Sequence, residues 1–150
     1  MDFKKICISK TLTIKEIETD SLEKAFPLIN QMRGHLTLEK YIEFVKLMKP
    51  YGYKIVCLFE NDEIVSYAGF AKQINLYYGH HIWVYDLITA EAKRGKGYGR
   101  ILLSHIEQYA KDNMLSCVAL SSSFKRKEAH RFYEEKMNYD KVSYVFKKDI

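Results

Sequence analysis

The sequence of 150 residues has little that would divide the chain, anchor it or mark it as fibrous. Its 2 prolines and 7 glycines are too few for a collagen-like or low-complexity chain. No apolar run approaches the roughly 18 residues that a membrane-spanning helix needs. The segment Met1–Ile6 has neither a long apolar stretch nor a small-residue cleavage site. We therefore predict no signal peptide, no membrane partner and a cytoplasmic protein.

Cysteine is scarce as well. The 3 cysteines, Cys7, Cys57 and Cys117, are odd in number and widely spaced, and they form no C-x-x-C pair. This pattern argues against a disulfide framework and against a zinc site, so we predict no metal.

The composition is that of one folded domain, which we place at residues 1–150. Hydrophobic residues make up 47% and charged residues 29%, which is enough for a packed core. Residues 1–90 hold 11 basic and 11 acidic residues, whereas residues 91–150 hold 13 basic and 8 acidic ones, so the whole net charge of +5 lies in the second part. On charge alone this excess favours a solvated basic face, and a surface that meets a polyanionic ligand is the alternative.

Hydrophobic periodicity predicts ten elements in the order β-α-α-β-β-β-α-β-α-β. The strands are expected at 10–17, 53–59, 64–71, 81–89, 115–120 and 139–146, and the helices at 21–32, 38–48, 97–111 and 127–137. Antiparallel strands followed by a β-α-β crossover indicate an α/β (α+β) fold with a mixed sheet. The strand at 115–120 is expected to be central and buried on both faces, and the strand at 139–146 to close the sheet.

Three alternating glycines separate the expected strand 81–89 from the helix that follows, in the run Arg94-Gly95-Lys96-Gly97-Tyr98-Gly99-Arg100. Glycine lets the backbone approach a ligand closely, and the free N–H groups of a helix start bind anions. A Walker loop would need Gly-Lys-Ser/Thr here, and a dinucleotide loop would need G-x-G-x-x-G, so neither template fits. A phosphate site is the preferred interpretation over a glycine-rich turn that only begins a helix.

Arg94–Gly99 resembles the R/Q-x-x-G-x-G/A signature of the GNAT superfamily of N-acetyltransferases. Ala129–Lys136 looks like the A-x-x-F/L-Y-E-x helix of that superfamily, and Asp86–Thr89 is similar to its D-L-x-V strand. The resemblance implies a GNAT-like domain that uses acetyl-CoA as cosubstrate. It also implies that the pyrophosphate lies at the glycine loop and helix start, where the binding residues would be Arg94, Gly95, Lys96, Gly97, Tyr98, Gly99 and Arg100.

The resemblance further implies that the backbone of Leu87, Ile88 and Thr89 holds the pantetheine and the thioester. Two positions depart from the superfamily pattern. Asn138 stands where glycine is common, but asparagine tolerates the left-handed conformation that ends a helix. Arg126 stands where many members have asparagine, and its guanidinium could meet a phosphate instead.

For the chemistry we expect direct attack of an amine on the thioester in a ternary complex. Tyr133 is the candidate general acid, because a phenol keeps its proton at neutral pH; the alternative is a core tyrosine. Asp86 lies in an apolar run and either accepts the proton of the amine or pairs with a basic group, and both roles stay open. His80 and His81 are expected to be solvated rather than catalytic, and Cys117 is not expected to be a nucleophile.

The acceptor is expected to be a primary amine, preferably of a small molecule, with a protein amino group or a non-catalytic acyl-CoA-binding module as alternatives. Its site is expected around residues 30–37 and 75–78. There Arg33 and His35 either contact an anionic substrate or simply belong to a loop between helices. No nucleic acid is expected, because the basic residues coincide with a glycine loop and not with a helix-turn-helix. A homodimer is left open.

Overall fold

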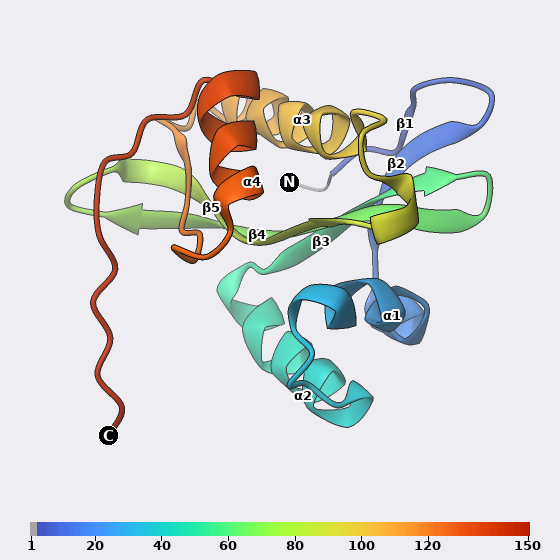
Figure 1. Ribbon diagram of the computed structural model, residues 1–150, viewed down its shortest axis with the longest axis horizontal. Coiled ribbons are helices and arrows are strands. Elements are labelled where there is room, and N and C mark those ends of the chain that lie inside the picture. Colours follow the sequence, from blue (N-terminus) through green and yellow to red (C-terminus); the bar gives the residue numbers. More distant parts are fainter. Residues whose placement is uncertain (1–2) are drawn as a thin grey trace. The chain divides into compact units, whose positions relative to one another are not determined.

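The computed structural model describes residues 3–150, so the first two residues of the segment used to exclude a signal peptide lie outside it (Figure 1). Six strands form one sheet in the order β1-β2-β3-β4-β5-β6. They are β1 Ile6–Cys7, β2 Leu12–Ile17, β3 Lys54–Glu60, β4 Glu63–Asn75, β5 Gly79–Thr89 and β6 Val118–Leu120. The helices are α1 Leu22–Met32, α2 Leu38–Met48, α3 Tyr98–Asp112 and α4 Lys127–Arg131, which runs on as the π-helical turn η4 Phe132–Lys136. Short 3₁₀ turns are η1 Thr19–Ser21, η2 Lys49–Tyr51 and η3 Glu91–Lys93.

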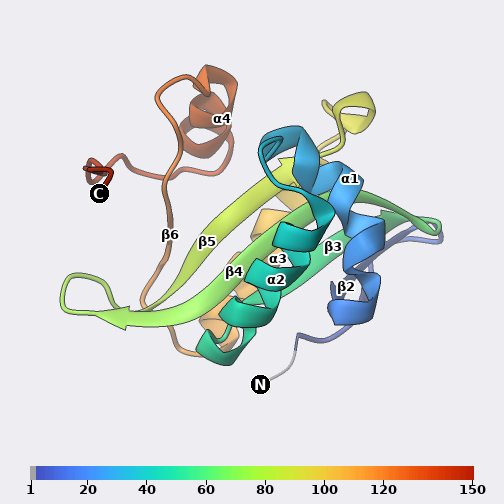
Figure 2. The same ribbon diagram turned by 90° about the horizontal axis from the view of Figure 1, so that it is seen from below.

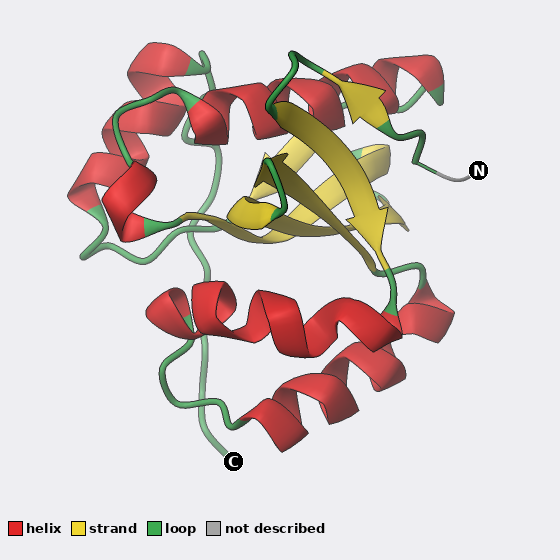
Figure 3. Ribbon diagram, turned by 90° about the vertical axis from the view of Figure 1, so that its right-hand side faces the viewer, coloured by secondary structure: helices red, strands yellow, loops and turns green. Residues whose placement is uncertain are grey.

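The chain divides into two compact units, residues 1–119 and 120–150, and each is described by itself. In the first unit β1 to β5 are antiparallel neighbours. Helices α1 and α2 cover one face of this sheet and α3 covers the other (Figures 1 and 3). Strand β3 is therefore apolar on both faces, and Ile55, Val56, Cys57 and Leu58 are fully buried. The α/β class with a mixed sheet is confirmed, whereas the single domain over 1–150 stays a prediction.

The face under α1 and α2 holds one hydrophobic cluster, to which Leu22, Ile29, Tyr41 and Tyr67 belong. Both helices cross this face side by side (Figure 2). Helix α2 begins where the sequence predicts, because the Thr37 side chain accepts a hydrogen bond of 3.2 Å from the backbone N–H of Lys40.

A β-bulge interrupts the pairing of β4 with β5. Gly69 lies opposite Asp86 and Phe70 lies opposite Val84, so Tyr85 is an extra residue on β5. A bulge twists its strand and re-aims the neighbouring side chains. Here it sets the direction of Asp86 on the face that α1 and α2 cover.

The second unit contains α4 and η4, which together fill the expected helix 127–137. Asn138 is left-handed at φ 58°, and the backbone N–H of Tyr139 donates to the Tyr133 carbonyl at 2.8 Å. Asparagine thus ends this helix as expected.

Two strand predictions are wrong. Strand β6 spans Val118–Leu120 instead of 115–120, and it is half-buried at the end of the sheet, not central. Residues 139–150 contain no strand, and Val142, Tyr144, Val145 and Phe146 are exposed. Alternation of apolar and polar residues fits a pleated surface, but it makes a strand only when a neighbouring strand pairs with it. Within residues 3–150, no helix is both long and apolar enough to cross a membrane.

Candidate active site

The glycine loop lies where β5 ends and α3 begins. Gly95 and Gly97 are left-handed, at φ 81° and 79°, and Gly97 is the N-cap of α3. A Cβ added at either position would meet no atom within 4 Å, so the chain needs these glycines for their conformation and not for space. The first N–H groups of α3 have no carbonyl partner within the helix, and they carry the positive end of its dipole. An exposed helix start of this kind attracts anions.

Cations surround the loop. Arg94, Lys96 and Arg100 are exposed, and the Arg94 Nε donates to the Thr89 carbonyl at 3.3 Å, which leads the arginine back along the strand end. The loop is also tied to its neighbours, because the N–H of Ala90 donates to the Val65 carbonyl at 2.9 Å. Of the basic residues predicted to meet the phosphates, Arg94, Lys96 and Arg100 thus follow the end of β5, whereas Arg126 belongs to the second unit.

Glu60, which the sequence did not indicate, connects the segments on either side of this loop. Glu60, at the end of β3, accepts from the Lys93 Nζ at 2.5 Å and from the hydroxyl of Tyr98. The hydrogen bond from Lys93, and next that from Tyr98, hold the pKa of Glu60 below its usual range, and the same contact raises the pKa of Lys93. One side chain therefore connects β3, η3 and the first residue of α3. A charged residue ending the apolar run 53–59 is the sequence signal that would have indicated it.

Asp86 lies three residues before the end of β5, beside the bulge. Its Oδ1 accepts from the Arg33 Nε at 3.0 Å, and the Arg33 Nη2 lies 3.0 Å from the same oxygen. Arg33 also donates through Nη2 to the Tyr85 carbonyl at 3.1 Å. The other carboxylate oxygen, Oδ2, accepts from the Tyr53 hydroxyl at 3.1 Å. Of the two roles left open for Asp86, pairing with a basic group is thus present in the structure.

A chain of buried phenols continues from Asp86 into the core. The Tyr53 hydroxyl lies 3.3 Å from that of Tyr67, which lies 3.0 Å from that of Tyr41 on α2. Burial raises the pKa of all three phenols, and the nearby Asp86 raises that of Tyr53 further. They stay neutral at physiological pH, so Tyr53 keeps a proton to donate to Asp86.

Gly69 makes this arrangement sterically possible. A Cβ at this position would lie 2.0 Å from the Tyr53 hydroxyl oxygen, and no real pair of atoms can be that close. Because Gly69 lies opposite Asp86 in the strand pairing, its missing side chain leaves the path along which Tyr53 reaches the carboxylate.

The structure also places the remaining candidate residues. His80 is exposed as expected, but the expectation that His81 is solvated is wrong: it is fully buried, and its Nδ1 lies 2.9 Å from the Gly79 carbonyl. Strand β5 begins earlier than predicted, at Gly79, so His81 lies inside the sheet. Residues 75–78 form the tip of the β4–β5 hairpin, at the opposite end of β5 from the glycine loop. His35 is exposed.

Tyr133 belongs to the second unit. It is buried and packs against Phe132 and Tyr139, with ring centroids 5.3 and 6.0 Å away. Burial raises its pKa, while the charge of Arg126 lowers it to a lesser extent. The phenol is therefore protonated at neutral pH.

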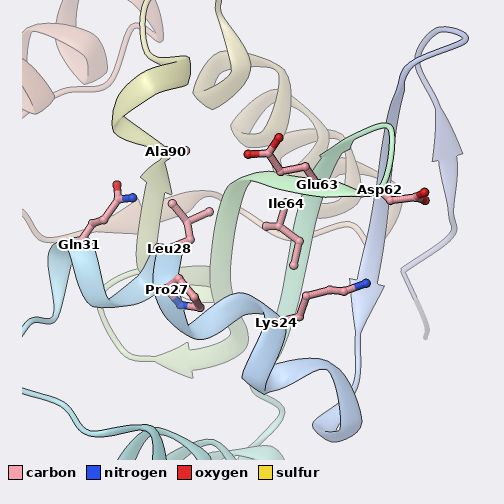
Figure 4. A pocket seen from close by; sticks show the side chains of 8 residues that line it. All are labelled: Lys24, Pro27, Leu28, Gln31, Asp62, Glu63, Ile64 and Ala90. Carbon is pink, nitrogen blue, oxygen red and sulfur yellow. The ribbon is translucent and has the colours of Figure 1, made fainter.

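An open groove of about 380 Å³ lies between α1 and the β3–β4 turn, next to the start of the glycine loop (Figure 4). It is lined by Lys24, Pro27, Leu28, Gln31, Asp62, Glu63, Ile64 and Ala90. Gln31 connects this groove to the loop, because its Oε1 accepts from the Glu91 N–H at 3.2 Å.

Similar known proteins show the family of this chain. The acetyltransferase (GNAT) family matches residues 14–139. The chain belongs to the GNAT family of N-acetyltransferases. It is 34% identical over 142 residues to an uncharacterised N-acetyltransferase, YhdJ, of Bacillus subtilis, covering 94% of this chain and 97% of the relative. The predicted family is confirmed, and with it an acetyltransferase that uses acetyl-CoA as cosubstrate.

Two further proteins share parts of this description. An aminoalkylphosphonate N-acetyltransferase of Salmonella typhimurium is 31% identical over 74 residues, which is 49% of this chain and 48% of that protein. The structure of the aminoglycoside N-acetyltransferase AAC(6')-Iy in complex with CoA has a TM-score of 0.81 at 9% identity, covering 96% of this chain and 99% of that one, and so shares its fold.

Proposed function

We propose that this acetyltransferase transfers the acetyl group of acetyl-CoA directly to a primary amine of a small molecule. The observation that carries the proposal is the position of Asp86: it lies on the strand that leads into the glycine loop, with its carboxylate oriented by Arg33 and Tyr53. The aminoalkylphosphonate N-acetyltransferase that is 31% identical over 74 residues is named for a small molecule that carries an amine, which supports this choice. A protein amino group is the competing acceptor.

On the cosubstrate side, the pyrophosphate binds at the start of α3. The N–H groups that follow Gly97 supply hydrogen bonds, and Arg94, Lys96 and Arg100 supply positive charge. Gly95, Tyr98 and Gly99 complete the loop, and Arg126 is a further candidate for a phosphate contact. The backbone of Leu87, Ile88 and Thr89 holds the pantetheine arm and leads the thioester back toward Asp86.

On the acceptor side, Asp86 takes the proton. The amine nitrogen forms a bond to the thioester carbonyl carbon, the carbon–sulfur bond breaks, one proton leaves the nitrogen and one proton reaches the sulfur. A carboxylate beside the bound amine accepts the first proton, directly or through water. Arg33 and Tyr53 orient this carboxylate before the amine binds, and the Tyr53 hydroxyl holds it while it accepts the proton. The reaction as proposed uses no metal and no covalent enzyme intermediate.

Tyr133 supplies the second proton. Its raised pKa keeps the phenol protonated at neutral pH, so it can donate a hydrogen bond and then its proton to the sulfur as the carbon–sulfur bond breaks. A thiol with a pKa of about 8.5 is the stronger acid, so this transfer is uphill, and the phenolate then takes a proton back from solvent. Tyr133→Phe keeps the ring and its packing against Phe132 and Tyr139 while removing the donor. We expect unchanged folding and acetyl-CoA affinity with turnover lowered about 10- to 10⁴-fold. A lower melting temperature at unchanged turnover would return Tyr133 to a purely structural role.

The test of the proposal is thiol release from acetyl-CoA in the presence of a panel of amines, with the acetylated product identified by mass spectrometry. Acetyl-CoA should bind, raise the melting temperature by mass action and lose its acetyl group to a small primary amine. Binding without transfer to any amine or to protein amino groups would instead indicate a non-catalytic acyl-CoA-binding module. Transfer to protein amino groups alone would leave the chemistry intact and overturn the small-molecule acceptor.

A further inference from the structure

The Arg33–Asp86 pair bears on which amines the site accepts, an inference that rests on the proposed function. The Asp86 side chain is 16% exposed, whereas that of Arg33 is 41% exposed. The carboxylate is thus the inner member of the pair and the guanidinium the outer one. An amine that approaches Asp86 must come to lie next to Arg33.

The contacts of Asp86 restrict how such an amine can bind. Oδ1 is occupied by the Arg33 fork and Oδ2 by the Tyr53 hydroxyl, so the carboxylate charge is already balanced. An ammonium group that carries no other charge adds a second cation beside the guanidinium. It either shares the carboxylate with Arg33, which puts two positive charges side by side, or displaces Arg33 and gives up the Arg33–Asp86 contacts; both outcomes lower its affinity.

A substrate that carries its own anion avoids this cost. Its ammonium group binds at Asp86 while its acidic group contacts Arg33, so that two ion pairs replace one and every charge stays balanced. The ammonium then loses one proton to solvent through Asp86, and the neutral amine that results attacks the thioester as proposed above. The guanidinium is suited to this exchange, because it offers several N–H donors in one plane and matches the oxygens of a carboxylate or phosphonate. Arg33 stands at the end of α1, where its side chain can turn from Asp86 to an incoming anion without a change in the sheet.

We propose that the acceptor is a primary amine that also bears an acidic group, and that Arg33 is the residue that selects it. Arg33 binds the acidic group, and Asp86 binds the amine. The discrimination is repulsive as well as attractive, since diamines bring a second positive charge to the guanidinium.

Matched acceptors test this. β-Alanine, β-alaninamide and 1,3-diaminopropane share a three-carbon frame and carry a negative, a neutral and a positive second group, and 2-aminoethylphosphonate replaces the carboxylate by a phosphonate. In thiol release with acetyl-CoA we expect kcat/KM to be about tenfold or more higher for the acids than for the amide, as for one charged hydrogen-bonded contact, and lowest for the diamine. The ratio between the two acids shows which anion Arg33 prefers.

The variant Arg33→Gln should reduce the preference for acid over amide to nearly one, mainly by raising KM for the acids. Arg33→Lys should keep part of the preference, because it keeps the charge and loses the fork. Lys54→Gln is the matched control: it removes a cation from another partly buried ion pair, Lys54–Glu16 at 3.2 Å, and should leave the ratio unchanged.

Wild-type enzyme that acetylates the amide or the diamine as well as the acids overturns the inference while leaving the proposed function intact, and so does a preference that survives Arg33→Gln. If Arg33→Gln fails to fold, the ranking by wild type and Arg33→Lys decides. Release of no thiol with any acceptor, despite acetyl-CoA binding, contradicts the proposed function itself.

Discussion

Two carboxylates of the first unit, Asp86 and Glu60, are each held by one cation and one tyrosine and have similar exposure, 16% and 22%. Their partners differ in what they connect. Glu60 accepts from Lys93, in η3 just before the glycine loop, and from Tyr98, in the first turn of α3. Asp86 accepts from an arginine fork and from a phenol that continues into a buried chain of tyrosines. The first cluster fixes backbone elements around an anion site, and the second fixes the orientation of one carboxylate. Two carboxylates of similar exposure can thus have different roles, and it is their hydrogen-bond partners that distinguish these roles.

Gly97→Val should weaken acetyl-CoA binding, and we expect this to be the largest loss of affinity among the variants below. Valine at φ 79° is strained by about 1–3 kcal/mol, and its branched Cβ blocks the approach of a phosphate to the start of α3. We expect the Kd for acetyl-CoA, measured by calorimetry, to rise about 10- to 100-fold. Gly52→Val is the matched control, because Gly52 has φ 89° and open space around its Cβ but lies outside the loop. It should lower stability and leave the Kd unchanged. Equal affinity of Gly97→Val and wild type would remove the loop from the cosubstrate site.

Gly69→Ala should disrupt the hydrogen bond from Tyr53 to Asp86. The added methyl group overlaps the rigid Tyr53 ring, so Tyr53 moves and loses Asp86, at a cost of about 1–3 kcal/mol in the free energy of unfolding. Turnover should fall while acetyl-CoA affinity stays near that of wild type. Gly34→Ala is the control, since its Cβ would meet its nearest atom, the Asn30 carbonyl oxygen, at an ordinary 3.5 Å. A Gly69→Ala enzyme with full stability and full turnover would show that Tyr53 does not need this path.

Glu60→Gln should weaken acetyl-CoA binding, but less than Gly97→Val does. The variant loses the ion pair between Glu60 and Lys93, which supports the glycine loop. Since a partly exposed ion pair contributes little free energy, we expect the Kd for acetyl-CoA to rise only about two- to fivefold at neutral pH. Because the pKa of Glu60 is lowered in the folded protein, its stabilising contribution is present above the usual glutamate range and is lost as pH falls through the folded value. The melting temperatures of wild type and variant should therefore converge at acid pH. Glu18→Gln, which breaks the Lys49–Glu18 pair, should leave the Kd alone. If the Glu60→Gln variant binds acetyl-CoA with the same Kd as wild type, Glu60 does not support the glycine loop in cosubstrate binding.

The sequence predicted those parts of the molecule that depend on local chemistry. Glycine conformation and helix capping act within a few residues, so the loop at Gly95 and Gly97 and the helix end at Asn138 are found as expected. The strands β2 to β5 are found where alternation and apolar runs predict them, and β4 and β5 extend further into their shared hairpin, to Asn75 and from Gly79.

The parts that the sequence did not predict depend on distant partners. Arg33 and Asp86 are 53 positions apart, and their contact depends on the bulge at Tyr85 and on where α1 ends. Glu60 reaches Lys93 only because β3 ends beside η3. The alternating segment 139–146 has a strand pattern, but its pairing depends on an edge elsewhere, and the pattern does not supply one.

Asp86→Asn tests the central claim, that Asp86 accepts the proton of the amine, most directly. The amide has nearly the same size but takes up no proton at this step. The measurement is the pH profile of kcat/KM for wild type and variant with two acceptors of different amine basicity, together with the Kd for acetyl-CoA. We predict a Kd within about twofold of wild type, turnover lowered about 10²- to 10⁴-fold, and an acidic limb that is present in wild type with both acceptors and flat in the variant. A limb that moves with the basicity of the acceptor in both enzymes would show that the substrate alone titrates, and it would contradict the role of Asp86.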